Sequence, residues 1–347
     1  MFRILTMSIA LFFTYAVSQE DQVFAQSSNP IVGQLIDSVA LRGIEDVHIE
    51  GEYVYLPCRE GKRLTICSIA NPAKPEIIST FTHPELGPAS GFAMNDDILY
   101  LASQGNTKLL VVDARDKSAL RLLGSVSVGS GIIYKIAYRD GYCFLAQQSE
   151  KKIYVIDVRN PRQPVVVATT EVTTEDDGPF SVLLKGHYAL VGTIFGKHNR
   201  MAVVDIKDPT SPQLVTQVFD PEICQVSGEI VGNLLFTANW DTNAFIVYDI
   251  ADVTHPKIVG KLVDERMGKP NRCAISGDRA YLPMVEGDGV AIIDISDPTH
   301  PQFLTSYRSH VMNKTYGVAI HGDLLLVGAR KGNSLLLFNR QMLEPGN

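Results

Sequence analysis

Short apolar runs separated by turn-forming residues recur along the whole chain. Between residues 273 and 307 this pattern predicts four short strands, at 273–276, 280–285, 290–295 and 302–307. A Gly-Asp turn, a tight loop and an Asx-Pro turn separate these segments, and such residues punctuate strands rather than helices. Short strands joined by turn signals favour an all-β fold.

The same four-strand unit occurs seven times at a nearly constant spacing. The third strand of each unit ends at an aspartate or a substitute for it, at Ser68, Asp113, Asp157, Asp205, Asp249, Asp294 and Asn339. The start of each unit precedes this position by a constant interval, which is longer only in the fourth unit: Glu45, Ser90, Tyr134, Phe180, Val226, Asn271 and Tyr316. A repeat in this range of lengths predicts a β-propeller.

The last unit lacks its fourth strand, and a matching strand is found at the other end of the chain. Residues 29–37, "NPIVGQLID", resemble residues 255–264, "HPKIVGKLVD", which contain the fourth strand of the fifth unit. We therefore predict that the N-terminal strand completes the last blade and closes the ring, which protects sheet edges that would otherwise be open. The predicted fold is a seven-bladed propeller of four-stranded blades, in one domain at 26–347.

The runs "LLVVD", "IYVID", "MAVVD" and "VAIID", together with the "DP" or "NP" that follows in several units, resemble the LVIVD repeat. This family comprises exported and surface proteins of bacteria and archaea and is expected to form β-propellers. The resemblance covers the chain from residue 26 onward and implies a fold and an extracytoplasmic setting, but it implies little about activity. Ser68 and Asn339, in the first and seventh units, depart from the repeat.

The segment 1–25 has the pattern of a secretory signal peptide. Arg3 precedes an apolar stretch at 4–17, and Val23-Phe24-Ala25 predicts cleavage before Gln26. An uncleaved membrane anchor is the alternative, but the stretch is shorter than the ~20 residues that span a bilayer. We expect an exported protein, whether periplasmic, secreted or on the cell surface, with no transmembrane segment after cleavage.

Composition excludes some classes of partner and cofactor. The net charge of -7 and the scattered basic residues argue against nucleic acid as a partner. Five cysteines without a CxxC pair indicate neither a disulfide framework nor a zinc site. Since HExxH, GxSxG, P-loop and EF-hand motifs are also absent from the sequence, we predict no metal or other cofactor.

The repeated aspartates are predicted to be structural. Asp294 and Asp297 flank an Asx-Pro turn that recurs around the ring, and Asx side chains accept hydrogen bonds from the backbone N–H groups of such turns. A residue needed once for chemistry would not be repeated in five units. Functional residues are therefore expected where the units differ, on the face that carries the loops joining second to third strands and fourth to first strands.

One group of differences consists of charges near the channel. Asp46, Lys135 and Arg272 occupy one column of the aligned units, and His48 and Glu229 interrupt a second column in which alanine is the usual residue. These five side chains form either a mutually paired lining that fills the channel or a site for an anionic or polar ligand, in which Lys135 and Arg272 donate hydrogen bonds.

Aromatic residues and insertions mark the same rim. Tyr134, Tyr316 and Trp240 are candidates to stack on a sugar or peptide, whereas Phe180 is expected to wedge blades together. The fourth unit has longer loops, "TTEDDG" and "IFGKHNR". They supply candidate partner contacts unless they reflect neutral drift: Asp176, Asp177, His198 and Arg200.

Three functions are compatible with these features. The first is an exported, non-enzymatic propeller that binds a protein, peptide or glycan through the loop-rich face and channel mouth. The second is a hydrolase or lyase in which His48 or Glu229 acts as a base and Arg272 stabilises negative charge. The third is a structural component of the envelope or surface.

Overall fold

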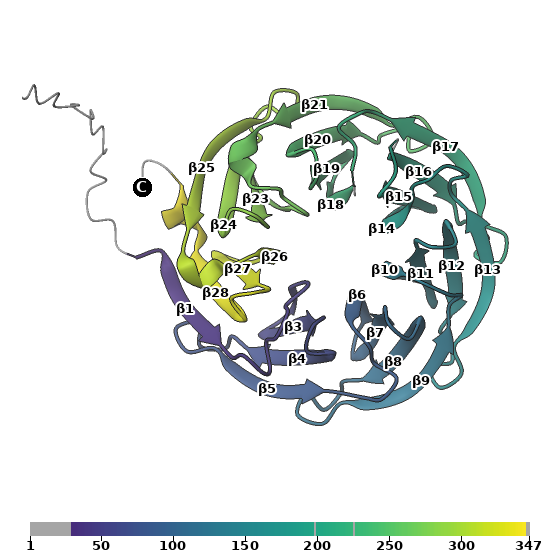
Figure 1. The fold of residues 1–347 in the computed structure, drawn as a ribbon, viewed down its shortest axis with the longest axis horizontal. Helices are drawn as coiled ribbons and strands as arrows, with labels where there is room; N and C mark the ends of the chain where they lie inside the picture. Colours follow the sequence, from purple (N-terminus) through teal and green to yellow (C-terminus); the bar gives the residue numbers. More distant parts are fainter. Residues whose placement is uncertain (1–28, 198, 225, 345–347) are drawn as a thin grey trace, which may run out of the picture.

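The structure, a computed structural model, describes residues 29–197, 199–224 and 226–344. The predicted signal peptide at 1–25 and His198 lie outside these residues. The described chain forms seven four-stranded antiparallel sheets arranged as blades around a ring (Figure 1). The prediction of an all-β, seven-bladed propeller is therefore confirmed.

In each blade the first strand faces the centre of the ring and the fourth lies at its circumference (Figure 1). Blades 1 to 3 contain β2 (His48–Glu50), β3 (Tyr53–Cys58), β4 (Arg63–Ser68) and β5 (Glu76–Phe81); β6 (Ala89–Asn95), β7 (Ile98–Ser103), β8 (Lys108–Asp113) and β9 (Arg121–Ser127); and β10 (Ile133–Arg139), β11 (Tyr142–Gln147), β12 (Lys152–Asp157) and β13 (Val165–Glu171).

Blades 4 to 7 contain β14 (Gly178–Lys185), β15 (Tyr188–Ile194), β16 (Arg200–Asp205) and β17 (Gln213–Phe219); β18 (Ser227–Val231), β19 (Leu234–Asn239), β20 (Ala244–Asp249) and β21 (Lys257–Val263); β22 (Ala274–Ser276), β23 (Arg279–Met284), β24 (Gly289–Asp294) and β25 (Gln302–Arg308); and β26 (Thr315–His321), β27 (Leu324–Ala329), β28 (Ser334–Asn339) and β1 (Ile31–Ile36). The four strands predicted in the sixth unit match β22 to β25 to within one residue at each end.

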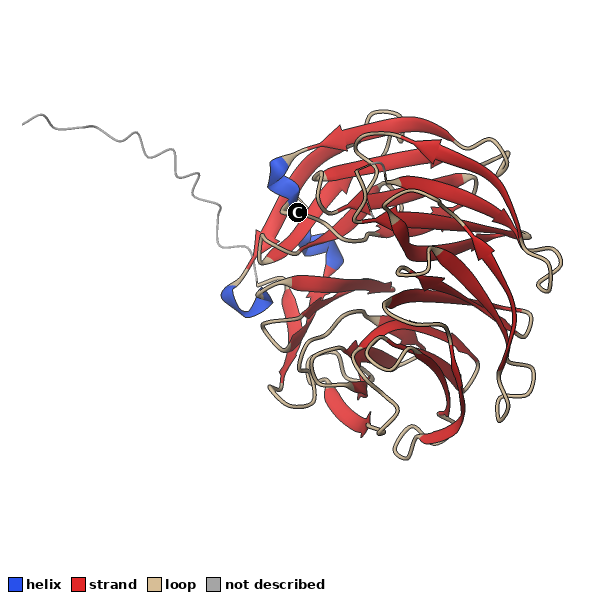
Figure 2. Cartoon of the chain, turned by 45° about the vertical axis from the view of Figure 1, so that its right-hand side comes forward, coloured by secondary structure: helices blue, strands red, loops and turns tan. Residues whose placement is uncertain are grey.

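The described residues include three short 3₁₀ helices: Glu265–Met267 and His310–Met312 lie in loops between blades, and Arg340–Leu343 follows β28 (Figure 2). Across the described ranges, no helix has the length and apolar character needed to cross a bilayer. All five cysteines are buried and free. Burial raises the pKa of each thiol, which keeps these side chains uncharged.

Strand β1 closes the ring by pairing antiparallel with β28. Leu35 lies opposite Leu335 and Ile36 opposite Ser334. Backbone hydrogen bonds extend the contact at both ends, where the N–H of Asn339 donates to Pro30 and the N–H of Asp37 donates to Asn333. The predicted completion of the last blade by the N-terminal strand is confirmed.

Seven buried apolar clusters hold the ring together, one between each pair of neighbouring blades. The cluster between blades 7 and 1, for example, joins Leu335 and Leu337 of β28 to Val54 and Leu56 of β3. Each central strand is buried on both faces because each sheet is covered by two neighbours, which explains the nearly continuous apolar runs in the second and third strands.

The repeated Asx turns have the structural role predicted for them. Asp294 Oδ1 accepts a hydrogen bond from the N–H of Ser296 at 2.9 Å, and Asp297 Oδ1 accepts one from Thr299 at 2.9 Å. The two exceptions in the repeat make the same contact, since Ser68 and Asn339 accept from the N–H groups two residues further on. The substitutions therefore preserve the turn.

These turns also contact the neighbouring blade. Gly33 of β1 packs against the carbonyl oxygen of Pro72, in the turn of blade 1, and Gly260 of β21 packs in the same way against Pro298 of blade 6. A Cβ atom at either glycine would collide with that backbone oxygen. Glycine is thus required at these two positions, where the outer strand lies against the next turn.

We predict that Gly33→Ala destabilises the propeller by about 1–3 kcal/mol, because the added methyl group forces β1 away from the turn of blade 1. Thermal and urea unfolding measure the effect. Val32→Ala, a substitution at a partly exposed site on the same strand, is the control and should change stability by less than about 0.5 kcal/mol. Equal stability of both variants would contradict close packing at Gly33.

Candidate functional site

Two rings of side chains surround one mouth of the central channel. Because the strands of a blade are antiparallel, the beginning of the first strand and the end of the second lie on the same face. The first ring, at or next to the start of the first strand, consists of Glu45, Ser90, Tyr134, Phe180, Val226, Asn271 and Tyr316. The second ring, directly after the second strand, consists of Arg59, Gln104, Gln148, Phe195, Trp240, Val285 and Arg330.

Members of both rings line a pocket of about 260 Å³. We call it the mouth pocket; its lining comprises Glu45, Arg59, Tyr134, Lys135, Phe180, Ile194, Phe195, Trp240, Asn271, Val285, Tyr316 and Arg330. Four of the residues predicted from the sequence as ligand contacts are brought together here: Tyr134, Lys135, Trp240 and Tyr316. The other four predicted contacts, Asp46, His48, Glu229 and Arg272, are not part of this lining.

Asp46, His48, Lys135 and Arg272 form an ionic cluster next to the pocket, the axial cluster. Lys135 Nζ lies 3.2 Å from Asp46 Oδ2, and Arg272 forms an ion pair with Asp46 Oδ1. His48 Nε2 is 3.2 Å from the same carboxylate. Blades 1, 3 and 6 therefore meet at one buried aspartate, and of the two predicted alternatives this arrangement matches the mutually paired lining.

Burial sets the protonation of this cluster. It lowers the pKa of Lys135, an effect that Glu45 opposes and Arg59 reinforces. Burial also lowers the pKa of Arg272 to about 10 and, with the charge of Lys135, lowers the pKa of His48 to about 3. At neutral pH the imidazole of His48 is therefore neutral, while Lys135 and Arg272 share the negative charge of Asp46.

Glu229 connects blades 5 and 6 instead of joining the axial cluster. Its Oε2 accepts a hydrogen bond from the backbone N–H of Ile275 at 2.8 Å, and burial raises the pKa of its carboxyl group. Arg272 is paired with Asp46, and the pKa of His48 lies far below that of a base working near neutral pH. The predicted assignment of catalytic roles to these three residues therefore gains no support from the geometry.

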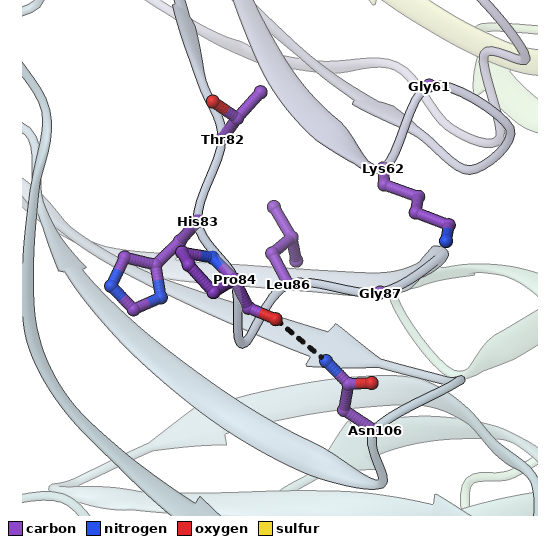
Figure 3. Close-up of a pocket in the computed structure, with 8 residues that line it drawn as sticks. All are labelled: Gly61, Lys62, Thr82, His83, Pro84, Leu86, Gly87 and Asn106. Atoms are coloured by element: carbon purple, nitrogen blue, oxygen red, sulfur yellow. Dashed lines mark hydrogen bonds between the residues drawn. The ribbon is translucent and has the colours of Figure 1, made fainter.

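A larger depression of about 450 Å³ lies on the same face between blades 1 and 2, and its lining includes Lys62, His83 and Asn106 (Figure 3). Two of its polar side chains already have partners, because Asn106 donates to the carbonyl oxygens of Pro84 and Glu85, and His83 Nδ1 accepts from the N–H of Glu85. No group of three or more His, Cys, Asp or Glu side chains with metal-binding geometry is found among the described residues.

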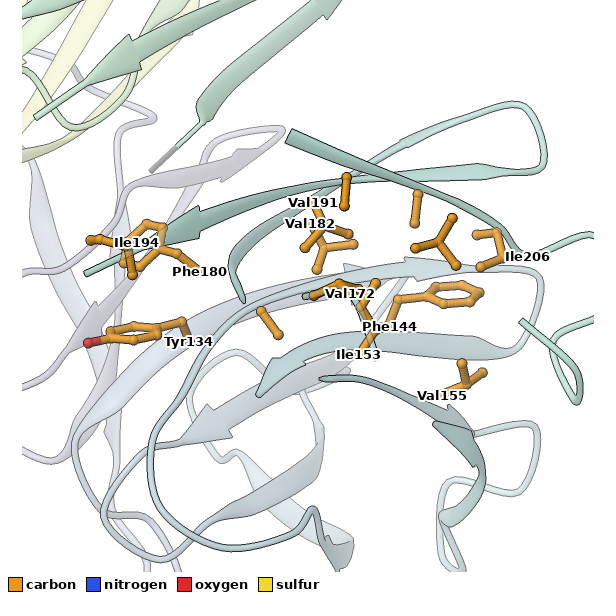
Figure 4. Close-up of a cluster of buried hydrophobic side chains, with 14 of the residues drawn as sticks. Tyr134, Phe144, Ile153, Val155, Val172, Phe180, Val182, Val191, Ile194 and Ile206 are labelled. Carbon is orange, nitrogen blue, oxygen red and sulfur yellow. The ribbon is translucent and has the colours of Figure 1, made fainter. Parts of the chain in front are cut away.

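Tyr134 and Phe180 belong to the core as well as to the mouth pocket. Their ring centroids are 4.7 Å apart, and both side chains pack into the apolar cluster between blades 3 and 4 (Figure 4). The prediction that Phe180 wedges blades together is confirmed, and Tyr134 has the same role. Tyr316 and Trp240 are only partly buried and have cationic neighbours, Arg330 at 4.8 Å and Lys269 at 5.9 Å from the ring centroids.

Unpaired polar atoms concentrate at this mouth. Eight buried side-chain nitrogen or oxygen atoms of the described residues have no hydrogen-bond partner, and five of them belong to the mouth pocket or the axial cluster: Glu45 Oε2, His48 Nε2, Trp240 Nε1, Asn271 Oδ1 and Arg272 Nε. Two of the five still have an ion-pair contact, Glu45 with Arg330 and His48 with Asp46. Glu45 and Asn271 are only 6% and 5% exposed. Since such atoms cost about 1–3 kcal/mol each when unpaired, their concentration makes this mouth the candidate site.

The insertions of the fourth unit brace one wall of the pocket. Asp177 is 1% exposed and accepts hydrogen bonds from Thr173, Thr193 and Arg200 at 2.5–3.0 Å. The expectation that Asp177 is a surface contact is therefore wrong, because its carboxylate is used inside the blade. Arg200 pairs with it and is largely buried as well.

This internal network positions a residue that the sequence reasoning missed. Gly196 packs against the backbone of Asp177, and exposed Asp176 accepts a hydrogen bond from the N–H of Lys197. The adjacent Phe195 is 56% exposed, lines the mouth pocket and has a φ of 69°. A bulky residue in this left-handed conformation is uncommon and is often associated with function.

Four more residues of the mouth pocket were not predicted from the sequence, although the repeat contained a signal for them: Glu45, Asn271, Arg59 and Arg330. Glu45 and Asn271 occupy the same column as Tyr134 and Tyr316, where they served only to mark the start of each unit. Comparing the residue after each second strand would have identified Arg59 and Arg330 together with Trp240.

Comparison with known proteins identifies the repeat. The sequence profile of the LVIVD repeat matches residues 42–83, 87–128, 180–220 and 267–309, which correspond to blades 1, 2, 4 and 6. The chain is an LVIVD-repeat protein. The resemblance predicted from the apolar runs is therefore confirmed. No curated protein matches this LVIVD-repeat protein significantly.

Solved structures share the fold of this LVIVD-repeat protein at low sequence identity. The β-propeller domain of Cps50 (Swd1) from Myceliophteria thermophila has a TM-score of 0.71 at 12% identity, covering 89% of this chain and 99% of that one. Hydrazine synthase of Kuenenia stuttgartiensis gives 0.69 at 14% identity, covering 91% and 99%. A chain of a mitotic checkpoint complex gives 0.67 at 11% identity, covering 96% and 99%. These similarities concern the fold alone.

We predict that Asp46→Asn destabilises the LVIVD propeller by about 3–5 kcal/mol, because Lys135 and Arg272 lose the negative charge that compensates them in a buried site. Urea unfolding at neutral pH measures the difference. Asp252→Asn, at an exposed aspartate in a turn of blade 5, is the matched control and should cost less than about 1 kcal/mol. A loss of the same size in both variants would contradict a central role for Asp46.

His48 should make stability depend on pH. Its pKa in the folded protein, about 3, lies below the value of 6.5 in the unfolded chain. Between these values the unfolded chain binds a proton that the folded protein does not, so the free energy of unfolding decreases as the pH falls below 6.5. The contribution reaches at most about 1.4 kcal/mol per pH unit.

The variant His48→Gln should remove this contribution. Urea unfolding of the parent and the variant at several pH values from 7 to 4.5 tests this, with His321→Gln at an exposed site as the control. If the stability of the parent protein changed with pH as it does in His48→Gln, folding would leave the pKa of His48 unchanged, contrary to this prediction.

Proposed function

We propose that this protein is an exported, non-enzymatic propeller that binds the terminal unit of a glycan in its mouth pocket. The proposal of export is supported by the pattern of residues 1–25 and by the resemblance to a family of exported proteins. The proposal of glycan binding is carried by one observation, the unpaired donor and acceptor atoms that line the pocket beside aromatic rings.

The unpaired atoms are of both kinds. Trp240 Nε1 is a donor, whereas Asn271 Oδ1 and Glu45 Oε2 are acceptors. A hydroxyl group donates and accepts at the same time, so a small polyhydroxylated ring can pair several of these atoms together. Water would also pair them, but a sugar combines such hydroxyl groups with apolar C–H faces.

The walls of the pocket suit those apolar faces. Trp240, Tyr316 and Phe195 come from three different blades and line the pocket while remaining partly or largely exposed. Aromatic rings beside polar groups bind ligands that have one apolar face and one polar edge. The volume of about 260 Å³ is below the roughly 300 Å³ at which pockets for drug-sized ligands begin, so a single sugar unit at the end of a chain is the appropriate size.

A protein or peptide partner is the second candidate, because Phe195 is 56% exposed on the loop-rich face. One propeller of similar fold is part of a mitotic checkpoint complex, an assembly of proteins. A partner of this kind would contact the wider rim, including Asp176, rather than fill the pocket. The unpaired buried atoms favour the glycan.

We predict that Trp240→Ala and Tyr316→Ala each weaken glycan binding at least tenfold and leave the melting temperature nearly unchanged, because both side chains lie at the rim. A glycan array identifies the oligosaccharides that bind, and titration calorimetry with these measures affinity.

Tyr142→Ala, a partly buried tyrosine on the opposite face, is the matched control and should retain full affinity. Unchanged affinity of both mouth variants would contradict the proposal. Unfolding of both would show that these rings are structural.

A further inference from the structure

Positive charge exceeds negative charge at the mouth pocket. Arg59, Lys135 and Arg330 line it, and Arg272 lies in the adjacent axial cluster. Among the described residues, three carboxylates pair with these cations: Glu45, Asp46 and Glu60. Because Glu60 also pairs with Lys331, these three carboxylates stand against five cations, which leaves an excess of two positive charges.

These carboxylates are already shared among the other cations. Asp46 pairs with both Lys135 and Arg272, and Glu45 Oε2 lies 3.5 Å from Arg330 Nη1. Arg330 is also paired with Glu60 at 3.2 Å. Arg59 instead donates through Nη2 to a neutral group, the amide oxygen of Gln104, at 2.5 Å. Arg59 is thus the cation of the pocket whose hydrogen-bonded partner carries no charge.

Two groups near Arg59 are affected by its charge. It contributes to the lowered pKa of Lys135, which burial lowers first, and it opposes the increase that burial causes in the pKa of Tyr134. Both effects mean that a negative charge placed between Arg59 and Lys135 would be stabilised. The planar guanidinium group of an arginine has five N–H donors that fit a carboxylate in two parallel hydrogen bonds.

We propose that the sugar in the mouth pocket is acidic and that Arg59, assisted by Lys135, binds its carboxylate. This inference rests on the proposed function and specifies its ligand class as a uronic acid, at the end of a chain or free. The sugar hydroxyl groups pair with Trp240 Nε1, Asn271 Oδ1 and Glu45 Oε2, and the carboxylate neutralises part of the excess positive charge. Phe195 and Tyr316 contribute apolar walls.

The test uses pairs of sugars that differ only in the acidic group: glucuronate with glucose, galacturonate with galactose, and mannuronate with mannose. Binding to the full chain is followed by ligand-observed NMR titration at low and high salt. We expect at least one acidic sugar to bind ten times or more tightly than its neutral partner. That preference should decrease at high salt because charged contacts are screened.

Arg59→Met should abolish the preference for the acidic sugar while changing affinity for the neutral partner less than threefold. Arg59→Lys retains the charge without the planar group, and should keep part of the preference. Arg162→Met, at an exposed arginine in a turn of the opposite face, is the matched control and should behave as the parent protein. Circular dichroism melts of all three variants verify that they fold.

The outcomes separate this inference from the proposed function. Equal binding of acidic and neutral sugars, or a preference that survives in Arg59→Met, would overturn the acidic ligand and leave sugar binding intact. Absence of binding by every sugar would overturn both. Binding of a short peptide through its terminal carboxylate, with no sugar bound, would also overturn both and assign the pocket to a peptide end.

Discussion

Every sheet in this protein depends on two neighbours, because its apolar faces are buried only when a blade lies on each side. The seven interblade clusters express this constraint directly, since each of them joins side chains of two adjacent blades. An incomplete ring would leave one face and one edge in water. The pairing of β1 with β28 therefore joins the two ends of the domain and completes the blade whose absence would expose its neighbours.

The closed ring separates positions that build the structure from positions that differ. Repeated features lie in the turns, where Asx side chains cap the backbone and contact the next blade across a glycine such as Gly260. Each blade contributes one residue to each of the two rings at the channel mouth, and here the residues vary from glutamate to tryptophan. A propeller can thus change the chemistry of its mouth without altering the contacts that support the fold.

Ion pairs in the central channel provide a second set of contacts between blades. Asp46, which precedes β2 in blade 1, connects three blades through its ion pairs with Lys135 and Arg272, in a position where unpaired charges would be costly. The same cluster brings cations close to the aromatic pocket, and burial lowers the pKa of Lys135. Structural ion pairing and the electrostatics of the candidate site are consequently coupled, because both depend on how many cations share Asp46 and Glu45.

Sequence reasoning was most successful for features that repeat and least successful for contacts between blades. Strand positions, blade number, ring closure and the role of Asp294 all followed from a pattern that recurs at a nearly constant spacing. Tyr134, Lys135, Trp240 and Tyr316 were predicted to lie on one face and do so, as part of one pocket. Asp177 was misplaced because the sequence shows an acidic loop and does not show that this carboxylate bonds within its own blade.

The sequence alone determined the architecture, since strand, turn and repeat signals are local and their sevenfold recurrence leaves one way to bury every apolar face. Only the tertiary structure decided how the polar side chains of different blades combine. Asp46 and Arg272 are distant in the chain, and whether such charges pair or remain available depends on distances of a few ångströms across the ring. The roles of Glu45, Asn271 and Arg59 likewise depend on which hydrogen-bonding groups of other residues lie within reach of them at the mouth of the channel.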